Sequence, residues 1–281
     1  MSNSLNGTLY LVATPIGNLS DISYRAVKTL EEADFIAAED TRITRGLLEH
    51  LGIKKPLVSY YRHNSRTSGE KILLRMLKGE NCALVTDAGT PGISDPGEDL
   101  VCLCVNENIP VILIPGPNAA VSALAVSGLD TGRFTFEGFL PADKKKRYLH
   151  LNELMTEKRT MVFFEAPHKL KRTLACMFKF FGDRRISISR EMTKIYEETL
   201  RMTLTEAIEH FNDKQPRGEF VLVVEGAINL PAPDGLLNEG IKYAVLLMKN
   251  GVSARDAVKK AADETGCSRN ALYKEIINDI M

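Results

Sequence analysis

The stretch that decides the fold is Glu80–Gly97, which reads ENCALVTDAGTPGISDPG. An apolar run, Ala83–Val85, leads into the carboxylate Asp87 and then into a loop rich in glycine and proline. Open α/β sheets build ligand sites in this way, at the carboxyl ends of buried strands. Glycine lets backbone approach a ligand, and proline stiffens the loop. The same letters also fit a plain strand-to-helix turn capped by Asp87, so this stretch alone leaves both interpretations open.

The first half of the chain repeats this strand-and-helix pattern five times with short crossovers. Such alternation predicts a parallel sheet covered on both faces, which is an α/β fold. Two further strand exits, Thr14–Asn18 and Pro115–Asn118, are also rich in glycine and proline. The first lacks the GxGxxG fingerprint, which excludes a Rossmann dinucleotide site there. The predicted strands are 8–13, 35–38, 57–60, 83–85 and 110–114, and the predicted helices are 22–32, 43–51, 68–77 and 98–106.

The second half predicts another, more mixed α/β unit and then a helical tail. Leu230–Gly235 is a linker by composition, and three short helices are expected after it, at 239–249, 254–264 and 269–280. Their spacing resembles a helix-turn-helix, but seven basic and seven acidic residues from Asp234 onward make a poor free-standing DNA binder. A subdomain that packs or contacts a dimer partner is an equal alternative. We expect domains at 1–116, 117–229 and 230–281.

Composition excludes several classes of protein. Five cysteines form neither a CxxC pair nor an even framework, so zinc and structural disulfides are not expected. The N-terminus lacks the pattern of a signal peptide, and no apolar run reaches the ~18 residues of a membrane span. We therefore expect a cytoplasmic protein with no membrane segment and no metal.

The formal net charge of zero hides an uneven distribution. Thr41–Lys78 holds nine basic residues against two acids, and Pro141–Arg190 holds thirteen against five. Charge separated in this way predicts a basic face for an anionic partner, although solvated helix faces would give the same counts.

Eight segments, in this order, closely resemble the tetrapyrrole methylase superfamily: LVATPIGNLSDIS, AAEDTR, LVTDAGTPGISDPG, IPGPNAA, FEGFLP, FFEAPHK, SREMTKIYEE and GEFVLVVEG. Within it they resemble the bacterial branch that methylates the ribose 2′-hydroxyl of a cytidine in 16S ribosomal RNA. The resemblance runs from about Gly7 to Gly226, and the helical tail matches as well. It implies two αβα domains with S-adenosylmethionine in the cleft between them, a homodimer, and the decoding region of the small ribosomal subunit as substrate.

Two other functions stay open at this point. A methylase of the same superfamily that acts on a corrin-type macrocycle is the runner-up, which the basic segments and the added tail oppose. A nucleic-acid-binding regulator that uses the tail is the third, which the tail's neutral charge weakens.

The resemblance assigns the methyl donor, by position, to loops of both domains. The first domain contributes Thr14, Pro15, Asp87, Ala88, Gly89, Ser94 and Asp95. The entry to the second domain adds Pro115, Gly116 and Pro117, and the second domain itself adds Phe139, Leu140, Glu165, Ala166, Glu219 and Phe220.

Methyl transfer from a sulfonium to a ribose hydroxyl is an in-line displacement, which a base near the hydroxyl assists. The candidate catalytic residues are Glu39, Asp40 and His168, with Glu165 as a further carboxylate; each also fits a cap or a structural salt bridge. Tyr60 or Tyr61 is expected to stack an unpaired base. The expected RNA-binding residues are Arg42, Arg45, Arg62, Arg66, Lys144, Lys145, Lys146, Arg147, Lys169 and Arg172.

Overall fold

The computed structural model describes residues 6–227 and 234–278. These residues form two compact units, one within Met1–Ser122 and Glu191–Glu197, the other within Ala123–Arg190 and Glu198–Met281. Of the predicted linker, residues 230–233 lie outside the described residues, as does the predicted end of the last helix at Ile280. The predicted α/β class, with two sheets and an added helical tail, is confirmed.

The first unit is built on a five-stranded parallel sheet in the order β3-β2-β4-β1-β5. Strands β2 and β4 are buried throughout because apolar side chains point to both faces. The strands are β1 (Leu9–Val12), β2 (Phe35–Ala38), β3 (Leu57–Ser59), β4 (Cys82–Val85) and β5 (Val111–Ile114).

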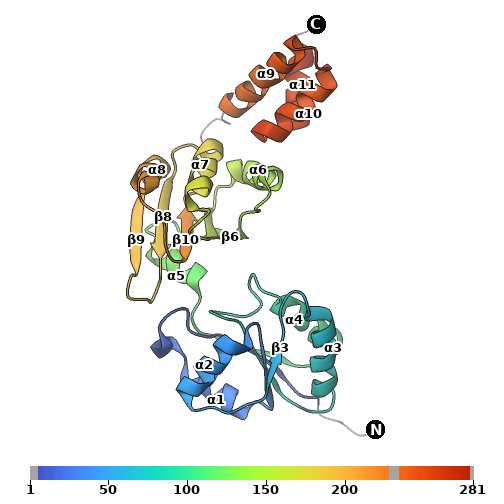
Figure 1. Ribbon diagram of the computed structural model, residues 1–281, viewed down its shortest axis with the longest axis vertical. Helices are drawn as coiled ribbons and strands as arrows, with labels where there is room; N and C mark the ends of the chain where they lie inside the picture. The colour runs from blue at the N-terminus through green and yellow to red at the C-terminus, as the bar shows by residue number, and fades with distance from the viewer. Residues whose placement is uncertain (1–5, 228–233, 279–281) are drawn as a thin grey trace. The chain divides into compact units, whose positions relative to one another are not determined.

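Helices cover both faces of this sheet, because alternate residues of each strand face opposite sides (Figure 1). Phe35 and Leu84 pack with α3 (Ser65–Met76) and α4 (Gly97–Asn106). Ile36 and Val85 pack with α1 (Tyr24–Glu32) and α2 (Thr41–Leu51). A short 3-10 helix, Leu19–Asp21, precedes α1.

The second unit contains a mixed five-stranded sheet in the order β6-β7-β10-β8-β9. Strands β6 and β7 are parallel, whereas β10 runs antiparallel to β7 and β8, and β8 runs antiparallel to β9. The strands are β6 (Phe134–Phe139), β7 (Thr160–Glu165), β8 (Arg185–Arg190), β9 (Glu198–Thr203) and β10 (Phe220–Val224). Strand β9 was not predicted, although Leu200 and Met202 alternate toward the core as a strand requires.

One apolar core joins this sheet to its helices and to the tail. The helices that follow the entry helix α5 (Ala119–Val126) are α6 (Lys144–Glu153), α7 (Leu170–Phe181) and α8 (Leu204–Asn212), with a 3-10 turn at Leu154–Thr156. The tail helices are α9 (Asp234–Lys249), α10 (Ala254–Thr265) and α11 (Arg269–Asn278). Ala257, Ala261 and Leu272 of the tail belong to the same buried cluster as Phe180 of α7. Among the described residues, no helix is long and apolar enough to cross a membrane.

Candidate active site

The carboxyl ends of β1, β2, β4 and β5 meet at one edge of the first sheet because these strands are parallel. The structure brings to this edge most of the first-unit residues that the sequence singles out. They are Thr14, Pro15, Glu39, Asp40, Asp87, Ala88, Gly89, Pro115, Gly116 and Pro117.

The loops after β1 and β4 are joined by backbone pairing. Thr14 N–H donates to the Gly89 carbonyl over 2.9 Å, and Gly89 N–H donates to the Thr14 carbonyl over 3.1 Å. The Thr14 hydroxyl also donates to the carbonyl of Thr86 over 3.2 Å. Gly89 has a φ of 83°, a left-handed conformation that glycine adopts without strain. This pairing fixes the two loops relative to each other.

Three carboxylates follow β2 and β4 at this edge: Glu39, Asp40 and Asp87. The hydroxyl of Thr86 donates to Oε2 of Glu39 over 2.7 Å. The backbone N–H of Asp40 donates to Oδ1 of Asp87 over 3.0 Å. Thr86 is not among the residues predicted from the sequence, although its place between the strand and Asp87 marks it as a strand-exit residue. The edge therefore presents concentrated negative charge, which suits a cationic ligand.

The pKa values of Asp40 and Asp87 are shifted in opposite directions. Hydrogen bonds from the side chain and backbone of Arg42 lower the pKa of Asp40 to about 2. Asp40 is also the N-cap of α2, so the alternative of a helix cap with a local ion pair is confirmed for it. Asp87 is exposed as a residue, but partial burial of its carboxyl group raises its pKa, and the nearby charges of Glu39 and Asp40 act in the same direction.

Asp95 organises the far half of the Asp87–Gly97 loop. Its carboxylate accepts hydrogen bonds from the backbone N–H groups of Gly92 and Gly97, at 2.9 and 2.7 Å for the shorter contacts. The exposed Ser94 beside it has a φ of 66°, which few non-glycine residues adopt. The Thr90 hydroxyl donates to the Pro117 carbonyl over 3.2 Å, so the β4 and β5 loops are also joined.

A groove of about 620 Å³ lies beside the loop after β1, and the sequence analysis did not find it. It is lined by Gly17, Asn18 and Leu19 on one side and by 193–196 on the other. A Cβ at Gly17 would lie 2.4 Å from Cγ of Lys194. Because glycine has no side chain, Lys194 can pack directly against the backbone of Gly17. Ile195 and Tyr196 are 95% and 73% exposed.

The second-unit residues assigned to the donor lie at one edge of the second sheet. The carboxyl ends of β6 and β7 meet the amino end of β10 there, because Phe139 pairs with Phe164 and Phe220 pairs with Glu165. Leu140 is buried, whereas Phe139 and Glu219 are exposed. Glu165 is buried and accepts hydrogen bonds from the Thr173 hydroxyl and the Ala166 N–H, so its carboxylate stabilises the turn into α7. His168, in that turn, is exposed.

Two residues expected to contact RNA are instead used within the fold. Arg147 is 4% exposed and donates to the carbonyls of Pro141 and Ala142, so its guanidinium is not at the surface. Tyr60 is 1% exposed, and its hydroxyl donates to the Pro96 carbonyl, so it cannot stack a base; burial also raises its pKa. Tyr61 is 41% exposed.

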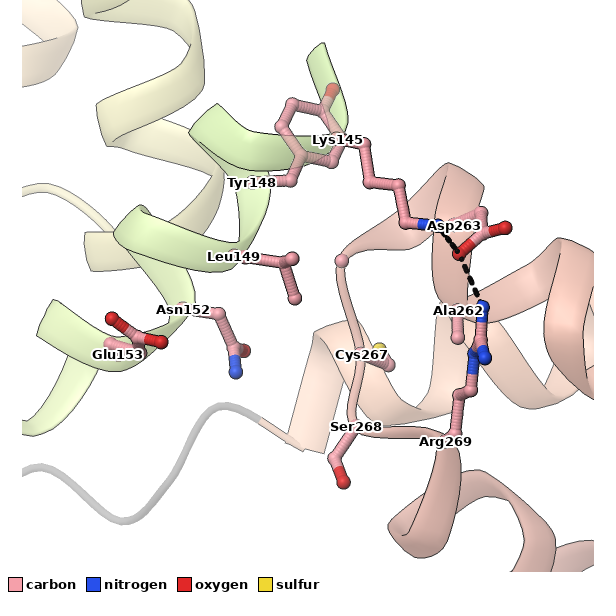
Figure 2. A pocket seen from close by; sticks show the side chains of 11 residues that line it. Lys145, Tyr148, Leu149, Asn152, Glu153, Ala262, Asp263, Cys267, Ser268 and Arg269 are labelled. Atoms are coloured by element: carbon pink, nitrogen blue, oxygen red, sulfur yellow. Dashed lines mark hydrogen bonds and ion pairs between the residues drawn. The ribbon is translucent and has the colours of Figure 1, made fainter. Parts of the chain in front are cut away.

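The other predicted basic residues reach the surface in different settings. Two of the lysines pair with acids of α10. Lys144 bonds Glu264 over 2.6 Å. Lys145 lies 3.2 Å from Asp263 (Figure 2). Arg42 pairs with Asp40, and Arg66 lies 4.0 Å from Glu70. Exposed positions are held by Arg45, Arg62, Lys146 and Arg172, and Lys169 is half-buried. In the described part of the chain, no group of three or more His, Cys, Asp or Glu side chains is arranged to hold a metal ion.

Comparison with known proteins follows the same motifs. The chain is 47% identical over 270 residues to a ribosomal RNA small subunit methyltransferase I of Halalkalibacterium halodurans, which covers 95% of this chain and 93% of that protein. A protein of the same name from Thermotoga maritima is 50% identical over 220 residues, which are 78% of this chain and 99% of that protein.

Solved structures share the fold at low identity. A uroporphyrin-III-C-methyltransferase of Thermus thermophilus superposes with a TM-score of 0.56 at 20% identity, covering 78% of this chain and 94% of that one. Another structure of that enzyme, complexed with S-adenyl homocysteine, gives 0.56 at 16% identity, covering 78% and 97%. The model of the tetrapyrrole (corrin/porphyrin) methylases matches residues 8–208. The resemblance seen in the sequence is thereby confirmed, and the chain belongs to the tetrapyrrole (corrin/porphyrin) methylase family.

Proposed function

We propose that this protein transfers a methyl group from S-adenosylmethionine to the 2′-hydroxyl of a cytidine ribose in 16S ribosomal RNA, in the decoding region of the small subunit. The observation that carries the proposal is the 47% identity, over nearly the whole of both chains, to a ribosomal RNA small subunit methyltransferase I. We infer from a ribosomal substrate that the protein works in the cytoplasm. Three solved tetrapyrrole methyltransferases are 20%, 16% and 17% identical to this chain and support the fold alone, so a corrin substrate is not favoured.

The edge of the first sheet suits S-adenosylmethionine by its charge and its backbone. The donor carries two positive groups, a sulfonium and an ammonium. Glu39, Asp40 and Asp87 supply negative charge at this edge, which would attract both groups. Gly116 is exposed, and a Cβ there would lie 3.0 Å from the Cβ of Ala13, so glycine lets the loop after β5 pass close to the loop after β1. We therefore keep the predicted donor residues of the first unit as the proposed site. The assignment of Phe139, Leu140, Glu165, Ala166, Glu219 and Phe220 to the donor stays a prediction.

The donor supplies a methyl carbon on positively charged sulfur: the ribose oxygen bonds to this carbon as the carbon–sulfur bond breaks, and the hydroxyl proton goes to a base. Asp40 is poorly suited to be that base because Arg42 holds its pKa near 2. Glu39 fits better, since it lies at the same edge and its Oε2 accepts a hydrogen bond from the neutral hydroxyl of Thr86. His168 stays the predicted candidate for the base on the second unit. In our proposal Asp40 shapes the site by ordering α2 and by donating its N–H to Asp87.

The exposed edge strand β5 supports a homodimer as the working form. Ile112 and Leu113 are neighbours on this strand and point to opposite faces, yet both are about half-exposed, at 45% and 49%. Val121 on α5 is 54% exposed. An open apolar edge strand is a template for pairing with another chain, and a second copy of the protein would cover it.

The direct test is methyl transfer to small ribosomal subunits that lack the modification. The full-length protein is incubated with labelled S-adenosylmethionine and these subunits, and the modified nucleotide is mapped. We expect one labelled cytidine, at its ribose. Asp87→Ala, which removes one carboxylate of the proposed donor site, should incorporate less label at limiting S-adenosylmethionine. Label in a base, in several nucleotides or only in a supplied tetrapyrrole would contradict the proposal.

A further inference from the structure

A basic groove of about 590 Å³ lies between the last two helices of the tail. Helix α10 contributes Arg255, Asp256, Val258 and Lys259, and α11 contributes Arg269 and Tyr273. Arg255 and Lys259 are four residues apart on α10, so they project from one face of that helix. Arg269 and Tyr273 have the same spacing on α11. The groove thus presents three cations and an aromatic ring that is 45% exposed.

The acids around the groove do not cancel its charge. The carboxylate of Asp256 accepts a hydrogen bond from the Ser253 hydroxyl over 2.7 Å. It lies in the first turn of α10, where the positive end of the helix dipole offsets its charge. Asp263 is shared between Arg269 at 3.0 Å and Lys145 at 3.2 Å, as Figure 2 shows. Burial opposes ionisation of Asp263, but the hydrogen bonds from Arg269 and Lys145 outweigh it and lower the pKa. Arg255 and Lys259 are both exposed.

The same ion pairs hold the groove in place on the second unit. Lys144 and Lys145 of α6 bond Glu264 and Asp263 of α10. Gly266, just after α10, packs so tightly that a Cβ there would lie 2.6 Å from Cζ of Phe180. A fixed cationic groove with an exposed tyrosine matches the chemistry of single-stranded RNA, whose phosphates pair with Arg and Lys and whose unpaired bases stack on aromatic rings.

The tail is an addition to the body that carries the proposed chemistry. The relative from Thermotoga maritima is matched over 99% of its length by only 78% of this chain, which leaves a part of comparable length to the tail without a counterpart. The Thermotoga maritima protein, which is also named ribosomal RNA small subunit methyltransferase I, therefore has no segment that matches this part. The tail is therefore expected to affect how tightly the substrate binds and not the transfer step.

We propose that the groove formed by Arg255, Lys259, Arg269 and Tyr273 binds the phosphate backbone and one unpaired base of the 16S ribosomal RNA substrate. This inference rests on the proposed function for the identity of the RNA. It assigns to the tail a second contact with the substrate, separate from the methyl-donor site.

The test is the double variant Arg255→Gln/Lys259→Gln in the full-length protein, compared with Lys242→Gln/Lys249→Gln. The control removes the same charge from exposed positions on α9 that do not line the groove. Binding to undermethylated small subunits is measured from 50 to 300 mM salt. Loss of two phosphate contacts should reduce the salt slope of log affinity by about 1.4 and the affinity at 0.1 M salt by about 20-fold. The control should match the wild-type protein.

Tyr273→Ala, compared with Tyr243→Ala on α9, tests the stacking contact. It should weaken binding roughly 5-fold or more without changing the salt slope, because no charge is removed. For both groove variants, KM for the subunits should rise while kcat and the affinity for S-adenosylmethionine stay at the wild-type values.

Failure of this inference can be told from failure of the proposed function. If the wild-type protein methylates the subunits but the groove variants match their controls in KM and salt slope, the groove does not bind RNA. If the groove variants instead change only the monomer–dimer equilibrium in sedimentation, the groove is a contact between two copies and the inference is overturned. Absence of methyl transfer by the wild-type protein would contradict the proposed function, and the binding measurement would still decide the groove.

Discussion

The backbone N–H of Asp40 donates to Oδ1 of Asp87 over 3.0 Å and joins the ends of two neighbouring strands, β2 and β4. The two residues are 47 positions apart in the chain. Through this bond, the helix that Asp40 caps and the loop that Asp87 begins share one fixed geometry. The consequences differ for the two side chains because their environments shift their pKa values in opposite directions.

Asp87→Asn should make the protein more stable at neutral pH and weaken donor binding. The folded-state pKa of Asp87 is raised, so the fold disfavours its ionised form, and wild-type stability falls as pH rises through that pKa. Asparagine has no charge to lose and can still accept the hydrogen bond from Asp40. Urea unfolding at pH 7 should show the variant as the more stable protein, and the gain should vanish below the ordinary value of 3.8.

Calorimetric titration of the same variant should show affinity for S-adenosylmethionine reduced at least about 10-fold, because a charged contact is removed. An Asp87→Asn protein that is less stable than wild type at pH 7 would show that burial does not strain this carboxylate.

Asp40→Asn and Asp40→Ala separate capping from catalysis. Asparagine is as good an N-cap as aspartate, so Asp40→Asn should keep stability within a few tenths of a kcal/mol, whereas Asp40→Ala should lose about 0.5–2 kcal/mol. Loss of a general base typically costs 10²–10⁴-fold in rate. We expect Asp40→Asn to lower methyl transfer less than about 10-fold, and a loss beyond about 100-fold would restore Asp40 as the base.

Gly266→Ala should undo the packing of the tail, and Gly251→Ala is its matched control. Both glycines have a φ of 82°, so alanine is strained equally at the two positions, by about 1–2 kcal/mol. A Cβ at position 251 meets nothing within 4 Å, whereas one at position 266 meets Phe180. The extra loss at Gly266, about 1–3 kcal/mol in urea unfolding, measures the overpacking. Equal losses would mean that the tail can shift without cost.

Leu113→Glu should make the protein monomeric if the proposed dimer pairs through β5. A carboxylate on the edge strand β5 blocks pairing with a second copy. Leu74→Glu is the control, because Leu74 lies on α3 and is 59% exposed, close to the 49% of Leu113. Sedimentation velocity at micromolar protein should show dimers for the wild type and the control and monomers for Leu113→Glu. A monomeric wild type, or a dimeric Leu113→Glu, would remove β5 from the interface.

The sequence was sufficient to predict the strands of the first sheet and the loops at its edge, because both depend on local patterns. Buried strands such as Cys82–Val85 are continuous apolar runs, and parallel strands must end at one edge. The hydrogen bonds from the Thr86 hydroxyl to Glu39 and from the Asp40 N–H to Asp87 could not be predicted, since each joins residues that follow different strands.

The surface position predicted for Arg147 is wrong, and the reason is physical. Arg147 was grouped with three lysines as a surface charge, yet it lies four residues before the buried Leu151 on α6 and so faces the core with it. The RNA contact of Lys144 and Lys145 stays a prediction, but their ion pairs were not predicted, because their acidic partners on α10 lie more than a hundred residues away. Long-range ion pairs of this kind leave no local pattern to read.

The segment Glu191–Glu197 belongs to the first unit, although the strands β8 and β9 on either side of it belong to the second. The order of synthesis therefore matters for folding. The parallel sheet can form as soon as β5 has left the ribosome. The groove beside Gly17 lacks the wall formed by 193–196 until the chain has been made through Tyr196. A nascent chain that stalls after β5 but before Tyr196 has the complete parallel sheet but not the segment Glu191–Glu197 that belongs to the same unit. Completion of the first unit thus waits for a hairpin of the second, which links the maturation of the two units in time.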